Sequence, residues 1–382
     1  MIYLNNAATS YPKPQSVIKA VTECLSRPLL HSSRTGFERE KDDYIYLCRE
    51  NLAKILNVKD PLHIVFSSGS TESLNLAIKG LNLKGSHVVT TAIEHNSVLR
   101  PLKTMELHGE ISISVVMCNE KGYIEPEWIA EAMNPNTKAV VVNHCSNVTG
   151  TVLDIKEIAK IVHKNGAVLI VDASQSAGTV PIDFDGWDID LLAFTGHKSL
   201  YGIQGIGGLC IKEGIELKPL KVGGTGILSE VLLQPDGLPI YYEAGTPNTP
   251  GIISLWAGTE FILNEGFEKI HSHKSYLVKK MIKELSEVPE VIIYYDPEHS
   301  SFSNFCFNIE GMVPEEVGYM LDSSFDIMVR TGLHCAPLVL EPLNVFPWGT
   351  VRASPSYFTK EEEIDTFIKA IKDIVYFVNR KK

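Results

Sequence analysis

Residues 139–172 contain the pattern that decides the fold: an apolar run AVVVN at 139–143, a predicted helix at 155–165 and a second apolar run, AVLIVD, at 167–172. Uninterrupted apolar runs are typical of strands whose two faces are both buried. Working outward, the same alternation of strand and helix extends from 62 to 210, with further predicted strands at 63–66, 88–91, 111–116, 191–194 and 207–211. The sequence therefore predicts an α/β fold with a mostly parallel sheet, helices on both faces, and a ligand site at the carboxyl ends of the strands.

The pattern changes after about residue 251. Predicted helices at 255–264 and 273–285, short strands at 291–295 and 303–309, and an amphipathic helix at 360–379 indicate a smaller α+β domain. Before it, the Gly- and Pro-rich segment 223–251 predicts a long loop of the kind that is usually functional. We expect an N-terminal arm at 1–15, a large domain at 16–255 and a small domain at 256–382.

The composition excludes several classes of protein. The chain has 382 residues, of which 44% are hydrophobic and 21% charged, which excludes a globally disordered or fibrous chain. With 35 Lys and Arg against 46 Asp and Glu, the net charge is −11, which argues against binding to nucleic acid or to an anionic membrane. No apolar run reaches the roughly 18 residues that a membrane helix needs.

The N-terminus and the cysteines indicate the compartment. The first residues, MIYLNNAATSYPKP, become polar after four residues, from which we expect neither a secretory signal nor a transit peptide. The seven cysteines include no CxxC pair, which argues against a zinc ribbon and a thioredoxin motif. We therefore expect a cytoplasmic protein with reduced thiols, most of them small buried side chains.

The most informative motif is TGHK at 195–198, directly after the predicted strand 191–194. A lone lysine is ordinarily solvated, but Lys198 follows a strand end, where the ligand crevice lies. Thr195 and His197 supply donors for a phosphate, and the glycines of 202–208 let the backbone approach a ligand closely. A lysine beside a phosphate site is the arrangement that pyridoxal 5′-phosphate (PLP) needs for a Schiff base.

Two further strand ends carry candidate cofactor contacts. The segment SSGSTE at 67–72 precedes a helix whose N-terminus can bind phosphate, although a simple N-cap by Ser70 or Thr71 is the alternative. No GK[ST] follows, so it is not a nucleotide P-loop. Asp172 ends the strand 167–172 and is a candidate partner of the pyridine nitrogen of PLP, with a turn-forming aspartate as the alternative.

A histidine and two cysteines complete the candidates. His95 follows the strand 88–91 and can stack on a planar ring and move protons, unless it is a structural histidine. Cys335 lies in the loop RTGLHCAP at 330–337, near Arg330 and His334, and is the best candidate for a reactive thiol. Only two potential metal ligands lie close together there, so we expect no metal. Cys145 is the rival nucleophile, although its place at a strand end favours a role in the cavity wall.

Taken in order, these motifs resemble those of the class V, fold-type I PLP enzymes, and within them the cysteine desulfurases of the short-loop group II form. The resemblance covers nearly the whole chain. Nine segments carry it: YLNNAAT at 3–9, SGSTE at 68–72, EHNS at 94–97, SNVTG at 146–150, DASQ at 172–175, TGHK at 195–198, EAGTPN at 243–248, RTGLHCAP at 330–337 and VRAS at 351–354.

The resemblance implies a fold-type I transferase with a large, mostly parallel seven-stranded domain and a smaller C-terminal domain. It also implies a homodimer with PLP in each site, L-cysteine as substrate, L-alanine as product, and a sulfur-acceptor protein. Sulfur would leave as a persulfide on Cys335, toward iron–sulfur clusters, thiolated nucleosides or another cofactor.

Roles for individual residues follow from the same resemblance. Lys198 would bond PLP and move the substrate α-proton, and Arg352 would hold the substrate carboxylate. The remaining residues would contact the cofactor or its neighbourhood: Asp172 at the ring nitrogen, Gln175 at the ring hydroxyl, His95 stacked on the ring, Asn147 at the ring edge and near the substrate, and Ser70, Thr71, Thr195, His197 and, across the dimer, Thr246 at the phosphate.

Three positions depart from the family pattern. Asn5 stands where the family usually has Asp, Leu333 where His is common, and Cys145 where Ala or Ser is usual. These departures leave the PLP assignment intact but leave the subfamily open.

Other functions remain open at this point. A selenocysteine lyase shares the scaffold, another class V aminotransferase or lyase would leave Cys335 incidental, and a sulfur-delivery scaffold would bind an acceptor without turnover. The glycines at 202–208 argue against a nicotinamide enzyme, because they follow the lysine and lack the GxGxxG order before a helix.

Overall fold

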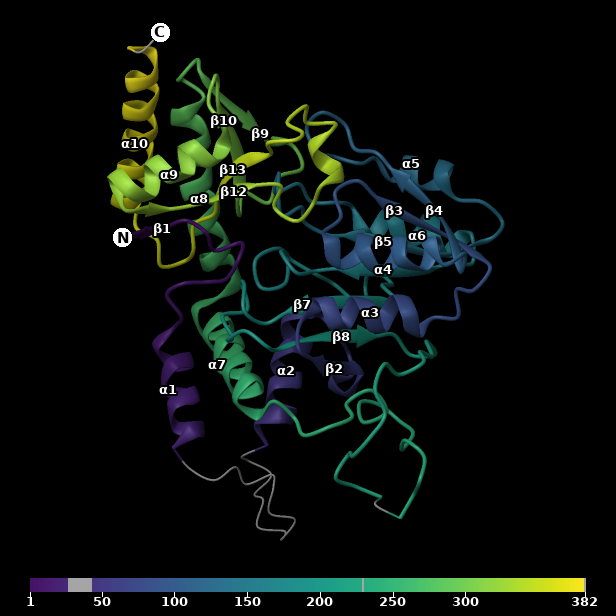
Figure 1. Cartoon of the computed structure of the whole chain (residues 1–382). Helices are drawn as coiled ribbons and strands as arrows, with labels where there is room; N and C mark the ends of the chain where they lie inside the picture. Colours follow the sequence, from purple (N-terminus) through teal and green to yellow (C-terminus); the bar gives the residue numbers. More distant parts are fainter. Residues whose placement is uncertain (27–42, 229, 381–382) are drawn as a thin grey trace.

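The computed structural model describes residues 1–26, 43–228 and 230–380. Within them, a seven-stranded sheet with the order β2-β8-β7-β6-β5-β3-β4 forms the centre of the larger part (Figure 1). Its strands are β2 (Ile64–Ser67), β3 (Ser86–Thr91), β4 (Ile111–Val116), β5 (Thr137–Asn143), β6 (Val168–Asp172), β7 (Leu191–Thr195) and β8 (Gly207–Ile211). The five neighbouring strands β4, β3, β5, β6 and β7 run parallel to one another, and β8 is antiparallel to both of its neighbours, β7 and β2. The expected mostly parallel sheet is therefore confirmed.

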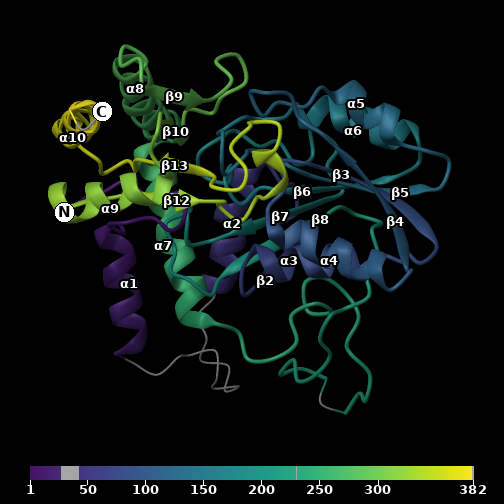
Figure 2. The same ribbon diagram turned by 45° about the horizontal axis from the view of Figure 1, so that its top comes forward.

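Helices cover both faces of this sheet because successive strand residues point to opposite sides. On β5, Ala139 and Val141 pack in one apolar cluster with α3 (Ser70–Gly80) and α4 (Asn96–Leu107). Val140 and Val142 belong to a second cluster, which includes residues of α2 (Tyr44–Leu56), α5 (Pro126–Ala132), α6 (Ile155–Lys164) and α7 (Thr249–Glu265). Figure 2 shows α3 and α4 on one side of the sheet and α5 and α6 on the other.

The register of the central strands gathers their polar ends at one edge. Asn143 at the end of β5 lies opposite Asp172 at the end of β6, and Asp172 lies opposite Ala193 of β7. Thr195 ends β7 two residues later. The carboxyl edge of the sheet therefore collects the segments that carry the predicted site.

The smaller part is built on a second sheet, antiparallel and ordered β12-β13-β10-β9. It comprises β9 (Val291–Tyr294), β10 (Phe305–Ile309), β12 (Arg330–Gly332) and β13 (Thr350–Ala353), with α8 (Phe267–Leu285), α9 (Pro314–Phe325) and α10 (Glu361–Asn379) packed on it. At the N-terminus, β1 (Ile2–Tyr3) pairs with β11 (Ile327–Met328), and α1 (Gln15–Leu25) follows (Figure 1). Short 3-10 turns lie at Pro61–His63 and Leu338–Leu340.

Most expected elements agree with the structure within two or three residues. The predicted loop region 223–251 ends earlier than expected because α7 begins at Thr249, with Asn248 as its N-cap. The pattern did not predict α1, α2, α4, α5, α9 or the strands β1, β11, β12 and β13. The division into an arm, a large domain and a small domain stays a prediction.

Candidate active site

A cavity of about 320 Å³ lies at the carboxyl edge of the large sheet. Nine of the predicted site residues line it: Ser70, Thr71, His95, Asn147, Gln175, Thr195, His197, Lys198 and Arg352. Asp172 lines an adjoining recess of about 30 Å³, which shares Ser70, His95, Asn147, Gln175 and Lys198 with the main cavity. The structure thus brings together ten of the predicted residues, from both parts of the chain.

One end of the cavity is formed by the N-terminus of α3. Its N-cap is Gly69, with φ of +147° and no side-chain cap, so the alternative of a cap by Ser70 or Thr71 is wrong. This φ, rather than lack of space, favours glycine, because a Cβ at position 69 would make only an ordinary contact of 3.6 Å with Thr195 Oγ1. Near the positive end of the helix, the Ser70 hydroxyl accepts from Ser174 Oγ at 2.7 Å and keeps its own proton to donate, as does the Thr71 hydroxyl, an arrangement suited to a phosphate.

His197 lies beside this end of the cavity. Its backbone carbonyl accepts from Ser10 N and Thr9 Oγ1, which ties the N-terminal arm to the loop after β7. Burial lowers the pKa of its imidazole to about 4, with the nearby Lys198 and Lys13 acting in the same direction. The ring is therefore neutral at pH 7, and its Nδ1 is buried without a partner among the described residues.

The floor of the site is formed by Asp172 and Lys198. Asp172 is buried, and its Oδ1 accepts from the backbone N–H of Ser174 at 2.9 Å and from the Ser174 hydroxyl. Burial lowers the pKa of Lys198 to about 8, against the opposing effect of Asp172. Arg352 and Arg330 also lower it. About a tenth of Lys198 is therefore an uncharged, nucleophilic amine at pH 7, a far larger fraction than for an exposed lysine.

His95 has a defined tautomer. Its Nδ1 accepts from the backbone N–H of Ser97 at 3.0 Å, which makes the ring the N-cap of α4. Burial lowers the pKa of His95 to about 4 despite the opposing Asp172. The ring is therefore neutral at pH 7, and its proton is on Nε2.

The remaining lining residues connect the two parts of the chain. Gln175 Nε2 donates to the carbonyl of Ala7 at 3.0 Å. Arg352 of β13 is buried, and burial lowers its pKa to about 10, so it stays charged at neutral pH. Its Nη1 donates to the Asn147 carbonyl at 2.8 Å and its Nη2 to Asn5 Oδ1 at 3.3 Å, while its Nε is buried and has no partner in the part of the chain that the structure describes. Both of these acceptors are neutral, which leaves the guanidinium charge for a carboxylate ligand.

The loop with Cys335 lies between β12 and β13. His334 and Cys335 have φ of +51° and +59°, which is uncommon for residues other than glycine. Asn147 Nδ2 donates to the His334 carbonyl at 2.7 Å, and the backbone N–H of Asn96 donates to the Cys335 carbonyl at 2.7 Å. Arg330 Nη2 donates to Cys335 Sγ at 3.1 Å. A strained, anchored turn thus presents a half-buried thiol beside a guanidinium.

Cys335 is not part of the main cavity lining. It borders an adjoining groove of about 350 Å³ that also contains Thr71 and His95 and is flanked by Lys79 and Arg100. Arg330 and His334, its neighbours on the loop, do line the main cavity. The thiol therefore lies where the inner cavity and the outer groove meet.

The rival cysteine is placed differently. Cys145 has only 2% of its surface exposed, and burial raises the pKa of its thiol. It lines the small recess near Asp172, and its Sγ lies 3.5 Å from Ser301 Oγ. A buried, protonated thiol suits a role in the wall. In the described ranges, no group of three or more His, Cys, Asp or Glu is arranged to hold a metal ion.

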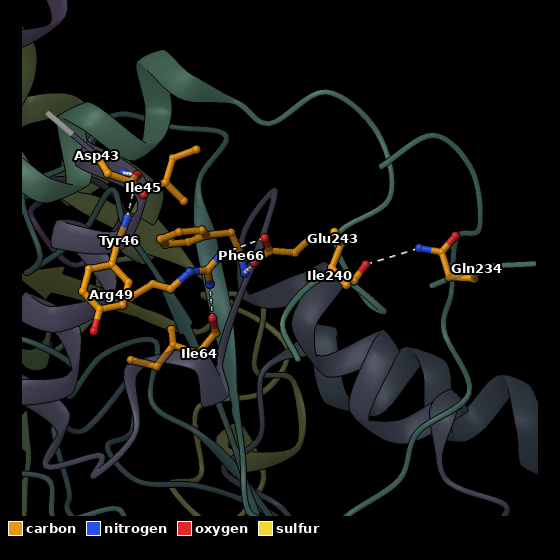
Figure 3. A network of polar contacts seen from close by, with 9 residues as sticks. All are labelled: Asp43, Ile45, Tyr46, Arg49, Ile64, Phe66, Gln234, Ile240 and Glu243. Atoms are coloured by element: carbon orange, nitrogen blue, oxygen red, sulfur yellow. Dashed lines mark hydrogen bonds and ion pairs between the residues drawn. The ribbon is translucent and has the colours of Figure 1, made fainter. Parts of the chain in front are cut away.

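Thr246 lies outside the cavity of its own chain and is exposed. The segment before it is fixed by Glu243, whose carboxylate pairs with the buried Arg49 of α2 at 2.7 Å and accepts from the Phe66 backbone N–H at 2.5 Å (Figure 3). Arg49 also donates to the carbonyl of Ile64, and its guanidinium carbon lies 4.3 Å from the centre of the Phe66 ring. The anchoring role of Glu243 was not expected, because nothing in the sequence pairs it with Arg49.

Comparison with known proteins agrees with this site. The family model described as aminotransferase class-V matches residues 2–367. A probable cysteine desulfurase of Methanothermobacter thermautotrophicus is 33% identical over 98% of this chain and 94% of its own length. Among solved structures, the cysteine desulfurase from Thermococcus onnurineus NA1 has a TM-score of 0.89 at 32% identity. The cysteine desulfurase CsdA from Escherichia coli has the same TM-score at 26% identity, and each comparison covers 98% of this chain and 94% of the other.

The matched residues span almost the full chain, and the cavity contains the lysine, aspartate, histidine and arginine that the motifs predicted. The chain belongs to the class V aminotransferase family and, within it, to the cysteine desulfurases.

Proposed function

We propose that the cavity carries out the cysteine desulfurase reaction with PLP bonded to Lys198 and with Cys335 as the sulfur carrier. In this reaction L-cysteine is converted to L-alanine, and the sulfur passes to the enzyme as a persulfide. The observation that carries the proposal is that the cavity contains a lysine with a lowered pKa and an arginine whose described hydrogen-bond acceptors are neutral, and that a guanidinium-paired thiol borders the adjoining groove.

The chain's own groups fit PLP. The phosphate would meet the first turn of α3, the hydroxyl of Thr195 and the unpartnered ring of His197, all of which line the cavity. Asp172 would hold the ring nitrogen protonated, and the amine of Lys198 would bond the aldehyde carbon. Bound in this way, PLP supplies an electron sink for the charge that develops on the substrate.

Substrate binding depends on Arg352. Its guanidinium is buried and charged, and its contacts with Asn147 and Asn5 are to neutral oxygens. A substrate carboxylate would meet this uncompensated charge, and a planar guanidinium can bind a carboxylate through two parallel hydrogen bonds. This contact would orient the Cα–H bond of cysteine toward Lys198, which removes the α-proton as a neutral amine.

Sulfur transfer depends on the Cys335 loop. The Cys335 thiolate attacks the substrate sulfur, so that an S–S bond forms and the substrate C–S bond breaks. The electron pair of the broken bond stays with the carbon fragment, which takes up a proton and leaves as alanine. Arg330 at 3.1 Å stabilises the negative charge on Sγ before the attack. The groove outside Cys335 would give the thiol of an acceptor protein access to the persulfide.

We also propose a homodimer. Residues 220–228 and 230–233 expose several large apolar side chains, with Leu232 and Leu233 exposed by 99% and 80%. Exposed apolar groups of this kind are typical of an interface between chains. In such a dimer Thr246 would reach the phosphate of the partner's cofactor. Replacement of Leu232 by Glu is expected to shift the protein to a monomer in light scattering, and Thr246→Val is expected to weaken PLP binding.

We propose a cytoplasmic location, supported by seven free cysteines of which six are buried. None of the helices in the described residues is long and apolar enough to cross a membrane. The sulfur would go to an acceptor protein and from there to iron–sulfur clusters or another thiolated product.

A single experiment tests the proposed function. The purified protein is mixed with L-cysteine, and its visible absorbance, the alanine released and the cyanide-reactive persulfide on the protein are followed together. We expect a cofactor band that changes on mixing and one persulfide per chain, mapped by mass spectrometry to Cys335. Much faster alanine release from selenocysteine would indicate a selenocysteine lyase, and a strict requirement for a 2-oxo acid would indicate an aminotransferase. A protein that binds an acceptor but releases no alanine would be a scaffold.

A further inference from the structure

Glu94 is a fully buried carboxyl group at the residue before His95. Its Oε1 accepts from Thr91 Oγ1 at 2.5 Å and from the backbone N–H of Asn143 at 2.9 Å. Its Oε2 is buried and has no hydrogen-bond partner within residues 1–26, 43–228 and 230–380. Both of the donors are neutral groups, so an ionised Glu94 would be a buried charge without a cationic hydrogen-bond partner, which is costly.

Asn143 contains a second buried oxygen without a donor. Its Nδ2 donates to the backbone carbonyl of Ile93 at 2.5 Å. Because a carbonyl can only accept, this contact fixes which side of the amide is nitrogen and which is oxygen. Oδ1 is then left buried and without a partner. Two unpartnered acceptor oxygens therefore belong to two residues that are already joined by the hydrogen bond from Asn143 N to Glu94.

A single proton on one of these two acceptors would give both of them a hydrogen bond. We propose that Glu94 is a neutral carboxylic acid in the folded protein, with its proton on Oε2 and Asn143 Oδ1 as acceptor, and that it positions the loop that carries His95. The alternative, an amide flip of Asn143, would direct its Oδ1 at the Ile93 carbonyl and lose a hydrogen bond. The electrostatics agree, because burial raises the pKa of Glu94 to about 8 and the charge of Asp172 acts in the same direction.

The position of Asp172 explains why a neutral group suits this place. Asp172 lies opposite Asn143 in the β5–β6 register, one strand away from the Glu94 contact. His95, the adjacent titratable ring, is neutral at pH 7 because burial lowers its pKa to about 4. A neutral Glu94 ties the residues 91–95 to the end of β5 without a second negative charge beside Asp172. The inference concerns protonation and positioning, so it does not depend on the reaction proposed above.

The first test compares thermal unfolding of the wild-type holoenzyme and Glu94→Gln between pH 5.5 and 8.5. The folded pKa of Glu94 is raised above the unfolded value near 4.3. Its protonated state therefore stabilises the wild type fully only below pH 4, and this stabilisation is lost as the pH rises toward 8. Gln can donate the same hydrogen bond at every pH. We expect the Tm of the variant minus that of the wild type to rise with pH, by at least about 2 °C over this range.

A matched control is Glu131→Gln, at an exposed position of α5. Its difference from the wild type is expected to stay constant with pH. A constant difference for Glu94→Gln as well would overturn the proposal, because it would mean that Glu94 is ionised in the folded protein across the range, as it is in the unfolded chain.

A second measurement does not depend on the folding of a variant. Infrared spectroscopy of the wild-type holoenzyme at pH 6.5 is expected to show the C=O band of a protonated carboxylic acid, because exposed carboxyl groups are ionised at this pH. The band is expected to disappear with a midpoint near pH 8 and to be absent from Glu94→Gln if that variant folds. The absence of any such band at pH 6.5 in the wild type would overturn the proposal.

Discussion

The floor of the cavity and the Cys335 loop meet at one site but are built by different means. Asp172, Lys198 and His95 follow three strands of a single sheet, where the strand register and the buried surroundings fix their positions. The Cys335 loop instead depends on a few hydrogen bonds from other segments, such as those from Asn147 and Asn96, and on two successive residues with positive φ.

The two regions therefore control the reactivity of their side chains in different ways. On the floor, burial sets the protonation states, since it lowers the pKa of Lys198 to about 8 and that of His95 to about 4. On the loop, the thiol is half-buried and its immediate partner is the single guanidinium of Arg330. We expect changes on the floor to remove cofactor binding and turnover together, and changes on the loop to affect sulfur transfer alone.

The largest expected effect is that of Lys198→Ala. Loss of the amine removes both the bond to PLP and the base for the α-proton, so alanine formation is expected to fall by at least about 1,000-fold. The visible cofactor band and alanine release measure the two losses. The exposed Lys164→Ala is the control and is expected to retain both. Normal alanine production by Lys198→Ala would contradict the role of the floor.

The next effect is that of Cys335→Ser on the loop. The variant is expected to bind PLP as the wild type does but to lose at least about 100-fold in persulfide formation, because a neutral hydroxyl is a poor nucleophile. Cys145→Ser is the matched control at a buried thiol and is expected to form persulfide normally. If the two results were reversed, Cys145 would be the sulfur carrier, and the floor rather than the loop would supply the nucleophile.

Arg330→Gln tests the cation on the loop. Without the guanidinium at 3.1 Å, the thiolate of Cys335 loses its stabilising positive charge. The rate of Cys335 alkylation by iodoacetamide at pH 7 is expected to fall by about 10-fold, whereas PLP remains bound. Peptide mapping after alkylation gives the rate at this residue alone. An unchanged rate would mean that the surroundings of the loop, rather than Arg330, determine its reactivity.

The pH dependence of the rate at which apoprotein binds PLP tests the cavity floor separately from the Cys335 loop. Only the neutral amine of Lys198 attacks an aldehyde, and its pKa is lowered to about 8. The folded protein therefore contains mostly protonated Lys198 at pH 7 and mostly neutral Lys198 at pH 9, and the capture rate is expected to rise by about 10-fold between them. Stopped-flow mixing of apoprotein with PLP measures this rate. A midpoint near 10.4, that of an exposed lysine, would show that burial does not control the floor.

The same difference explains what the sequence could predict. Asp172 and Lys198 were assigned because each follows an apolar strand of ordinary length, and such strands appear clearly in the pattern. The strands β12 and β13 were not predicted, because they are only three and four residues long and include Arg330, Gly332 and Arg352. Arg352 is buried by contacts with the distant segments of Asn5 and Asn147, which local periodicity does not contain.

Two further features could not be predicted from the local sequence pattern. Helix α4 begins at a histidine N-cap and contains Pro101, so it lacks the usual signals for the start and interior of a helix. The pairing of Arg49 with Glu243 joins residues far apart in the chain. Motif resemblance placed Glu243 and Arg352 in the right segments, but only the folded chain showed which groups they contact.

The smallest expected effect is that of Asn5→Asp, where the chain departs from the usual residue of its family. Asn5 Oδ1 accepts from Arg352 Nη2 at 3.3 Å and leaves the guanidinium charge uncompensated. An aspartate there would pair with the guanidinium and compete with the substrate carboxylate. We expect the KM for L-cysteine to rise by about 3-fold, with kcat nearly unchanged, because such a change affects binding rather than the chemical step.

The control is Asn134→Asp, at an exposed turn where the Asn134 side chain accepts a hydrogen bond from the Asn136 backbone. It adds the same charge away from the cavity and is expected to leave KM unchanged. A lower KM in Asn5→Asp would mean that the carboxylate helps to orient Arg352 more than it neutralises its charge. The N-terminal segment that carries Asn5 would then resemble the Cys335 loop, because both would act through hydrogen-bond geometry rather than through charge.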